Sequence, residues 1–283
     1  MIATLPLPRR FRWTYAAYVL VFFVYLAAPL LVVGVFAFND SRFPALPWQG
    51  FTLDWFIANT PERTGLMHDR GIIRSVGVSA LVAGCVTFLA VTLATLNAFL
   101  FERCQFPGKN LLFILMLLPL VIPGVILGIS ILIFASRIAN YFDFNHDILL
   151  DMLRPGLLLV VLGQFAFLST IATLVISARL RTFDVQLEEA ARNLGASPLT
   201  AVLTVTLPFL APAMIGAGLI CFLMSFENFN TTLMLVGSDA PLTITLFSRL
   251  REGATPVLNA VSLLLMLGSM LLALLAVRVQ KRA

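Results

Sequence analysis

The side chains best suited to a chemical role in this chain lie in one charged segment between two long apolar runs. Two glutamates, two alanines and a glycine come in close succession there, and a proline follows at the start of the next apolar run: Glu188, Glu189, Ala190, Ala191, Gly195 and Pro208. Carboxylates beside small side chains suit close docking of another protein, because small residues let a partner approach the helix backbone. We therefore expect this segment to bind a partner outside the membrane.

Local signals predict a helix over this segment. Asp184 can serve as its N-cap, and a narrow apolar stripe follows at helical spacing, formed by Leu187, Ala190, Ala191 and Leu194. Glu188 and Arg192 stand four residues apart on the opposite side, in the order that favours an ion pair. The pattern thus predicts an amphipathic helix whose polar face carries an ion pair between Glu188 and Arg192.

The residues after this helix predict a tight turn into a second helix. Gly195 suits the left-handed conformation that closes a helix, and Ser197 followed by Pro198 is typical of an N-cap and a first helical residue. Such a helical hairpin has two interpretations. It is a docking element for a soluble protein, or it is an amphipathic helix that lies on the inner leaflet.

Glu227 is the one acidic side chain embedded in an apolar run, and three polar residues accompany it: Asn228, Asn230 and Thr231. A charge at membrane depth costs about 2.5 kcal/mol or more unless it faces protein or water. One interpretation makes these four residues part of the path of a cationic solute. The other makes Glu227 a structural group that pairs with an arginine such as Arg249 or Arg251 and only holds helices together.

The composition indicates an integral membrane protein. Hydrophobic residues make up 60% of the chain and charged residues 12%, and the mean hydropathy is +0.97. A soluble domain is closer to half apolar and a quarter charged. The net charge of +5 does not indicate a nucleic-acid partner, because the basic residues lie at the ends of apolar runs. The three cysteines have no pairing pattern, so we expect neither disulfides nor a bound metal.

Six apolar segments are long enough to cross a bilayer, which needs about 20 residues. They make the chain one all-α transmembrane domain, residues 1–283, whose predicted spans are 15–38, 75–101, 111–135, 156–177, 205–236 and 257–277. With the N-terminus inside, the inner segments hold 11 of the 19 basic residues and only four of the 14 acidic ones. Both termini, residues 1–14 and 278–283, and the loop 178–204 are therefore predicted to be cytoplasmic.

The longest polar segment is the predicted outer loop, residues 39–74. Its aromatic residues, among them Trp48 and Trp55, suit a helix that lies on the outer membrane surface. The loop is either a platform for an extracytoplasmic partner or a packed loop that caps the helices.

The cytoplasmic loop resembles that of permease subunits of ABC importers. The match is Glu189-Ala-Ala, three residues, Gly195, nine residues and then Val205-Thr-Leu-Pro208, with valine where isoleucine is commoner. The resemblance implies a type I importer permease of MetI-like architecture in a bacterial inner membrane, with the coupling helix between the fourth and fifth spans. It further implies that this helix inserts into a cleft of an ATPase and that Pro208 sets the entry into the fifth span.

The resemblance also implies partners, because this chain has no nucleotide site of its own. A phosphate-binding loop ends in Gly-Lys-Ser or Gly-Lys-Thr, whereas Gly108-Lys109 is followed by Asn110. The expected complex holds two ATP-binding subunits that bind ATP and Mg²⁺, a second permease, identical or homologous, and an extracytoplasmic solute-binding protein. This chain itself is then not an enzyme.

Three shorter stretches are similar to the polyamine branch of that family, which imports putrescine and spermidine: residues 225–228, 241–244 and 253–260. One position departs from that pattern, since relatives often carry an acidic residue where this chain has Gly124. The three similar stretches make a polyamine the expected solute, whereas Gly124 leaves other solutes open. The alternatives are an opine, an amino acid derivative, an aminophosphonate, iron or thiamine.

Two other classes of membrane protein fit the sequence less well. A stand-alone channel or carrier would show motifs such as paired Asn-Pro-Ala loops, which this chain lacks. An intramembrane hydrolase would need a nucleophile beside a base, but His68 and His146 both fall in predicted outer loops.

Overall fold

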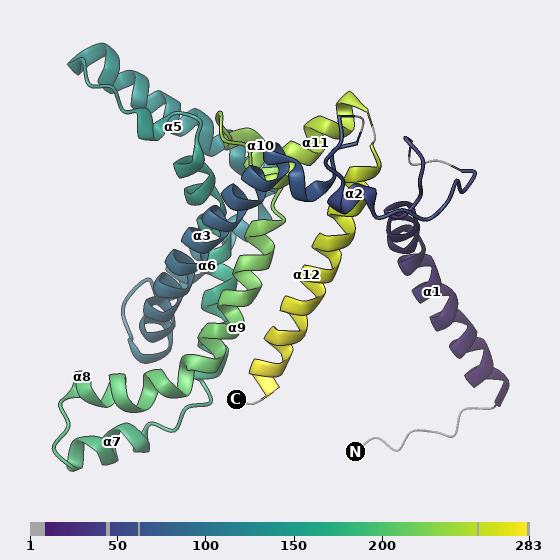
Figure 1. The fold of residues 1–283 in the computed structure, drawn as a ribbon. Coiled ribbons are helices and arrows are strands. Elements are labelled where there is room, and N and C mark those ends of the chain that lie inside the picture. Colours follow the sequence, from purple (N-terminus) through teal and green to yellow (C-terminus); the bar gives the residue numbers. More distant parts are fainter. Residues whose placement is uncertain (1–8, 44–45, 62, 254, 282–283) are drawn as a thin grey trace. The chain divides into compact units, whose positions relative to one another are not determined.

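A computed structural model describes residues 9–43, 46–61, 63–253 and 255–281 of the chain (Figure 1). Within this part the secondary structure is helical, with two isolated bridges and no sheet. The longer helices are α1 (Arg9–Phe36), α3 (Arg70–Arg103), α4 (Lys109–Val121), α5 (Gly124–His146), α6 (Leu157–Leu180), α9 (Leu207–Phe226), α11 (Leu242–Glu252) and α12 (Pro256–Lys281). The shorter ones are α2 (Asp54–Ile57), α7 (Gln186–Asn193), α8 (Pro198–Ala201), α10 (Asn230–Leu235), two 3₁₀ turns, η1 (Leu66–His68) and η2 (Asp151–Leu153), and a π-turn, η3 (Val202–Thr206).

The described residues contain six helices that are long and apolar enough to cross a membrane, which confirms the predicted number. They are Arg10–Phe36, Arg70–Arg103, Gly124–His146, Leu157–Leu180, Pro198–Phe226 and Pro256–Arg278. The first, second, fourth and sixth predicted spans match four of these helices. The third and fifth predicted spans are each interrupted.

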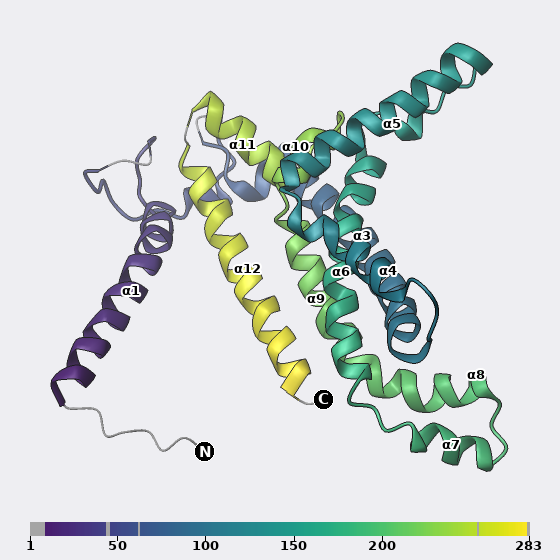
Figure 2. The same cartoon turned by 180° about the vertical axis from the view of Figure 1, so that it is seen from behind.

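The third predicted span, residues 111–135, is wrong as one continuous helix. The helix α4 ends at Val121, Ile122 has extended backbone angles, and α5 begins at Gly124. Pro123 explains the break, because it has no N–H for the helix and forces the preceding residue out of the α region. Figure 2 shows α5 leaving the direction of α4 at this point.

The fifth predicted span, residues 205–236, is likewise wrong as one helix. The helix α9 ends at Phe226, and the short helix α10 begins at Asn230. The side-chain oxygen of Asn228 accepts hydrogen bonds from the Thr232 backbone N–H at 3.2 Å and from the Thr232 hydroxyl at 3.0 Å. These bonds satisfy a free donor of α10 and stabilise the interruption.

The chain divides into two compact units, and the larger comprises Arg70–Ser248 with Gly268–Ala283. Its core joins α3, α6 and α9. The helix α3 buries a stripe with one residue in every four, formed by Val82, Val86, Ala90, Ala94 and Ala98. Three alanines in that stripe allow close helix packing, which is the usual way for helices to associate in a membrane. The facing helix α6 is the most buried of the six spans.

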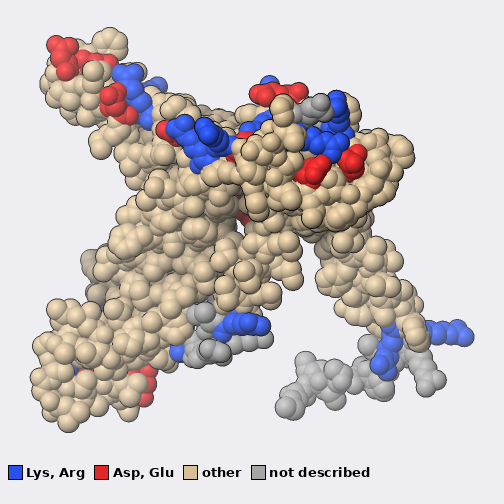
Figure 3. All heavy atoms as spheres, viewed as in Figure 1, with Lys and Arg blue, Asp and Glu red and all other residues tan. Residues whose placement is uncertain are grey.

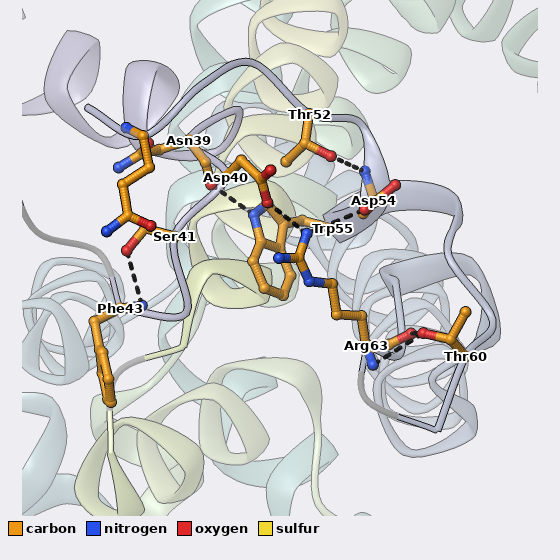
Figure 4. Close-up of polar contacts among 10 residues, drawn as sticks. Asn39, Asp40, Ser41, Phe43, Thr52, Asp54, Trp55, Thr60 and Arg63 are labelled. Atoms are coloured by element: carbon orange, nitrogen blue, oxygen red, sulfur yellow. Dashed lines mark hydrogen bonds and ion pairs between the residues drawn. The ribbon is translucent and has the colours of Figure 1, made fainter.

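The second unit comprises Met1–Asp69 with Arg249–Leu267, and the described part of the predicted outer loop, residues 39–43, 46–61 and 63–69, forms a small folded module in it. Arg63 bridges the carboxylates of Asp40 and Asp54, and its guanidinium lies 5.2 Å from the ring centre of Trp55 (Figure 4). The Trp55 N–H donates to the Asn39 carbonyl at 2.8 Å. The hydrogen bond to Asp40 raises the pKa of Arg63, which keeps it charged. The predicted surface helix is here only the four-residue α2.

Charged side chains gather at the ends of the long helices, with extended uncharged stretches between them on the face shown in Figure 3. Apolar side chains on the spans stay exposed in the isolated chain; Phe88 of α3, for example, is 72% exposed. Lipid tails or a second subunit cover such surfaces in membrane proteins.

Candidate functional site

The predicted cytoplasmic loop forms a helical hairpin in which α7 and α8 lie side by side (Figures 1 and 2). Gly195 joins them with φ = +96°, which confirms the predicted left-handed turn. The Ser197 hydroxyl accepts a hydrogen bond from the Thr200 N–H at 3.1 Å, and Pro198 opens α8, so this N-cap is confirmed as well. Asp184 accepts from the Gln186 N–H at 3.0 Å, just ahead of α7. We call residues 184–201 the coupling hairpin.

Glu188 has a different partner from the predicted one. Its carboxylate accepts a hydrogen bond from Arg103 at the end of α3, at 3.2 Å, and a second one from the Thr206 hydroxyl. The predicted pair with Arg192 is therefore wrong. Glu188 binds Arg103, which is distant in sequence, and not the arginine four residues along its own helix. The side chains of Glu188 and Arg103 are 18% and 25% exposed, so this contact is shielded from solvent.

Further contacts tie the residues just before the coupling hairpin to the end of α3. Arg181 forms an ion pair with Glu102 at 2.9 Å, so the end of α6 is tied to the end of α3. The Arg103 guanidinium also lies 5.4 Å from the ring centre of Phe183. These contacts connect α7 to the end of α3, and the end of α6 to the same end of α3.

The π-turn η3 connects the coupling hairpin to α9, and the sequence analysis did not predict it. Pro208 explains it, because a proline offers no N–H to the Thr204 carbonyl that a continuous α-helix would pair with it. The Leu207 N–H bonds instead to the Val202 carbonyl, one residue further back. Thr206, which binds Glu188, is the last residue of this turn and is completely buried. Single π-turns of this type are frequent at functional sites.

The outward side of the coupling hairpin carries exposed charged, small and apolar residues. Glu189 and Ala190 are exposed, whereas Ala191 is half-buried. Leu194 is 91% exposed, and Leu187 and Leu199 are also open to solvent. Apolar side chains in such a polar segment are typical of a protein interface. The geometry thus separates the two glutamates, since Glu188 binds Arg103 and Thr206 whereas Glu189 is exposed.

The structure places Glu227 in the interruption between α9 and α10. It is exposed in the isolated chain, and its carboxylate accepts a hydrogen bond from Ser269 of α12. Arg249, the suggested structural partner, binds Asp69 instead, with one bond of 2.9 Å. Pairing of Glu227 with an arginine therefore stays an untested interpretation.

A buried polar network fixes this interruption to α6. Gln164 donates to the Thr232 hydroxyl at 2.9 Å and accepts from the Ser225 hydroxyl, and Thr232 binds Asn228. Gln164 is only 1% exposed. In the sequence, Gln164 interrupts the apolar run of the fourth predicted span. Its position in mid-span, where an amide needs buried partners, was the available signal.

The other three residues of the predicted solute path meet at one cavity. Asn228, Asn230 and Thr231 line a pocket of about 260 Å³ together with residues from the break between α4 and α5, including Gly124. The structure thus brings together two helix interruptions that lie far apart in the sequence. Glu227 is adjacent in sequence but does not line this cavity.

Residues 90–283 match the family described as binding-protein-dependent transport system inner membrane component. The chain belongs to this family. It is a multi-pass inner-membrane permease subunit of the ABC importer class, with the predicted all-α architecture.

Curated relatives and solved structures agree with this assignment. The chain is 31% identical over 246 residues to the putrescine transport system permease protein PotI of Escherichia coli K12, covering 86% of this chain and 82% of PotI. It is 26% identical to the spermidine/putrescine transport system permease protein PotC of Haemophilus influenzae, covering 92% and 93%.

Two solved importers share the fold. One chain of the bacterial alginate ABC transporter, in complex with an alginate-loaded periplasmic protein, has a TM-score of 0.73 at 16% identity, and 96% of each chain is covered. The MetNI methionine ABC transporter has a TM-score of 0.55 at 17% identity, covering 76% of this chain and 95% of the other.

Proposed function

We propose that this permease forms half of the pore of an ATP-driven polyamine importer, with putrescine or spermidine as its solute. The solute assignment rests on the relatives named above, PotI and PotC. The acidic and amide groups at the interruption between α9 and α10 support it, because a carboxylate beside hydrogen-bond acceptors suits a cation.

The observation that carries the coupling part of the proposal is the coupling hairpin. Its base is bound to α3 through Glu188 and Arg103, while Glu189, Ala190 and Leu194 remain exposed. A docking element needs both properties: a free outer side for the partner and a firm connection to the membrane helices. Residues Glu188, Glu189, Ala190, Ala191, Gly195 and Pro208 together then carry motion from the partner to the spans, and Glu189 is the residue that touches the partner.

The proposed partners are two ATP-binding subunits, a second permease and an extracytoplasmic binding protein. ATP and Mg²⁺ bind to the ATPase subunits, whose closure moves the coupling hairpins together. The pore then opens outward to receive the solute, and ATP hydrolysis returns it to the inward state. Solute passes Glu227 and the polar residues next to it: Asn228, Asn230 and Thr231.

Mass spectrometry of the proteins that co-purify with the tagged chain in mild detergent tests this proposal. We expect an ATPase subunit, a second permease chain or a further copy of this one, and a binding protein. That binding protein is then titrated with putrescine and spermidine in a calorimeter. Recovery of this chain alone, in a folded state, would contradict the coupling assignment. A binding protein that ignores both polyamines would contradict the proposed solute.

A further inference from the structure

Two phenylalanine rings meet at the base of the coupling hairpin. Phe183 immediately precedes the hairpin, and Phe209 belongs to the first turn of α9, just after the π-turn η3. Their ring centres lie 5.1 Å apart in an edge-to-face arrangement, which is a geometry that aromatic pairs favour. Phe183 is 7% exposed, and Phe209 is half-buried. This ring contact therefore holds the two ends of the hairpin segment together.

An arginine lies over each of these rings. The guanidinium carbon of Arg103 is 5.4 Å from the ring centre of Phe183, and that of Arg179 is 3.9 Å from the ring centre of Phe209. Both distances are within the range of about 6 Å over which a ring face attracts a cation. We call these four residues the arginine–aromatic ladder; in order along it they are Arg103, Phe183, Phe209 and Arg179.

The two arginines of the ladder come from the ends of different spans. Arg103 is in the last turn of α3, and Arg179 is in the last turn of α6. A positive charge is favourable at both places, because the carboxyl end of a helix carries a partial negative charge. The ladder thus joins α3, α6 and α9 beside the base of the coupling hairpin.

Arg103 connects the ladder to the hairpin itself. Its guanidinium binds Glu188 of α7 at 3.2 Å and also lies over Phe183. A hydrogen bond weakens steeply when its angle falls below about 120°, whereas a ring attracts a cation over its whole face within about 6 Å. Contacts of the second kind persist when the two groups slide past each other. They therefore suit a joint between helices that change their angle.

We propose that the arginine–aromatic ladder carries movement of the coupling hairpin into α6 and α9, with Phe209 and Arg179 as positioning residues for the coupling of ATP hydrolysis to transport. This rests on the proposed function, because the ladder has this task only if a partner moves the hairpin. The pair of Glu188 and Arg103 ties the hairpin to α3, and the ladder extends that connection to two further spans.

The test is ATP hydrolysis by the whole complex in nanodiscs, with and without the co-purified binding protein, in the presence of putrescine. Phe209→Leu removes a ring contact and a cation–ring contact, which together are worth about a factor of ten. We expect it to lower the stimulation by the binding protein about tenfold. Arg179→Gln loses only the cation and should lower the stimulation about threefold.

Two further readouts separate positioning from a general loss of structure. Phe209→Tyr keeps the ring and should retain the normal stimulation. ATP hydrolysis without binding protein should be unchanged in Phe209→Leu and Arg179→Gln. A fall of this basal rate in proportion to the stimulated rate would mean that these residues only hold the fold, and it would contradict the proposal.

Phe113→Leu is the matched control. Phe113 is also half-buried and meets the buried ring of Phe101 edge to face, at 5.4 Å, but among the described residues no arginine lies over this pair. This variant should keep the normal stimulation. If Phe209→Leu is stimulated normally, or if Phe113→Leu loses as much stimulation, the role of the ladder is refuted. If the binding protein does not stimulate the unaltered complex, the proposed function fails instead.

Discussion

Glu188 of α7 accepts a hydrogen bond from Arg103 at the end of α3 at 3.2 Å, across 85 residues of sequence. Because Glu188 also binds Thr206, the carboxylate joins the coupling hairpin, the second span and the start of the fifth span. The connection is direct and partly buried. We therefore expect a displacement of α7 to move the end of α3 and the start of the fifth span.

This relationship predicts a measurable energetic coupling. Glu188→Gln and Arg103→Gln should each lower the Tm of the purified complex, and the double variant should lose less than the sum of the two. We expect a coupling energy of about 1–2 kcal/mol from a double-mutant cycle. The pair Arg181–Glu102 is the control, since the Arg181 side chain is 62% exposed and its coupling should stay below about 1 kcal/mol. Additive effects at Glu188 and Arg103 would refute the connection.

Gly195 offers a second prediction, with an internal control in Gly108. Both residues have positive φ, +96° and +84°, and a Cβ atom at either position would meet nothing within 4 Å. Alanine at either position should therefore cost about 1 kcal/mol of stability through backbone strain alone.

Only Gly195→Ala should lower ATP-dependent uptake at a temperature where both variants are folded, because Gly195 sets the angle between α7 and α8. Thermal unfolding and uptake measured on the same preparations check this expectation. Equal uptake by the two variants would mean that the turn has no special part in coupling.

Glu227 offers a third prediction that separates its two interpretations. If it lies on the solute path, Glu227→Gln should reduce uptake of putrescine about tenfold or more, since the site loses its charge. Ser269→Ala removes only the hydrogen bond that holds the carboxylate, and it should change uptake less than threefold. Initial rates at several putrescine concentrations give the comparison. Equal losses in the two variants would indicate a structural role for Glu227.

The outer module gives a fourth prediction. Arg63 is the bridge between Asp40 and Asp54 beside Trp55, so Arg63→Gln should loosen residues 39–69 and speed their cleavage by chymotrypsin in the intact complex. Arg74→Gln breaks an exposed pair with Asp239 outside the module, and it should leave the cleavage rate unchanged. If the Arg63 variant is cleaved no faster, the network does not stabilise the loop.

The sequence predicted the number of spans and the coupling hairpin well, because both depend on local patterns. The turn at Gly195 and the cap at Ser197 follow from the conformations those residue types favour. The breaks at Pro123 and Asn228 were harder to predict. Proline is tolerated inside membrane helices when neighbours satisfy the freed carbonyls, so sequence alone does not separate a kink from a break.

The contacts of Glu188 show why the rest of the site was not predictable. The rule for residues four apart favoured Arg192, but in the folded chain Glu188 pairs with Arg103 at the end of α3. In the same way, the cavity beside Gly124 depends on two helix interruptions that meet only in the folded chain. Both features arise from contacts between distant segments, for which local spacing carries no signal.

The coupling of this permease to ATP hydrolysis is tested most directly by uptake in proteoliposomes that contain the whole complex with Glu189→Arg. Glu189 is exposed, so its reversal should leave insertion and assembly intact. Glu252→Arg, an equal charge reversal at the exposed end of α11, is the control. The account predicts that ATP-dependent putrescine uptake falls to the background level in Glu189→Arg and stays normal in the control. Normal ATP-dependent uptake by Glu189→Arg would contradict it.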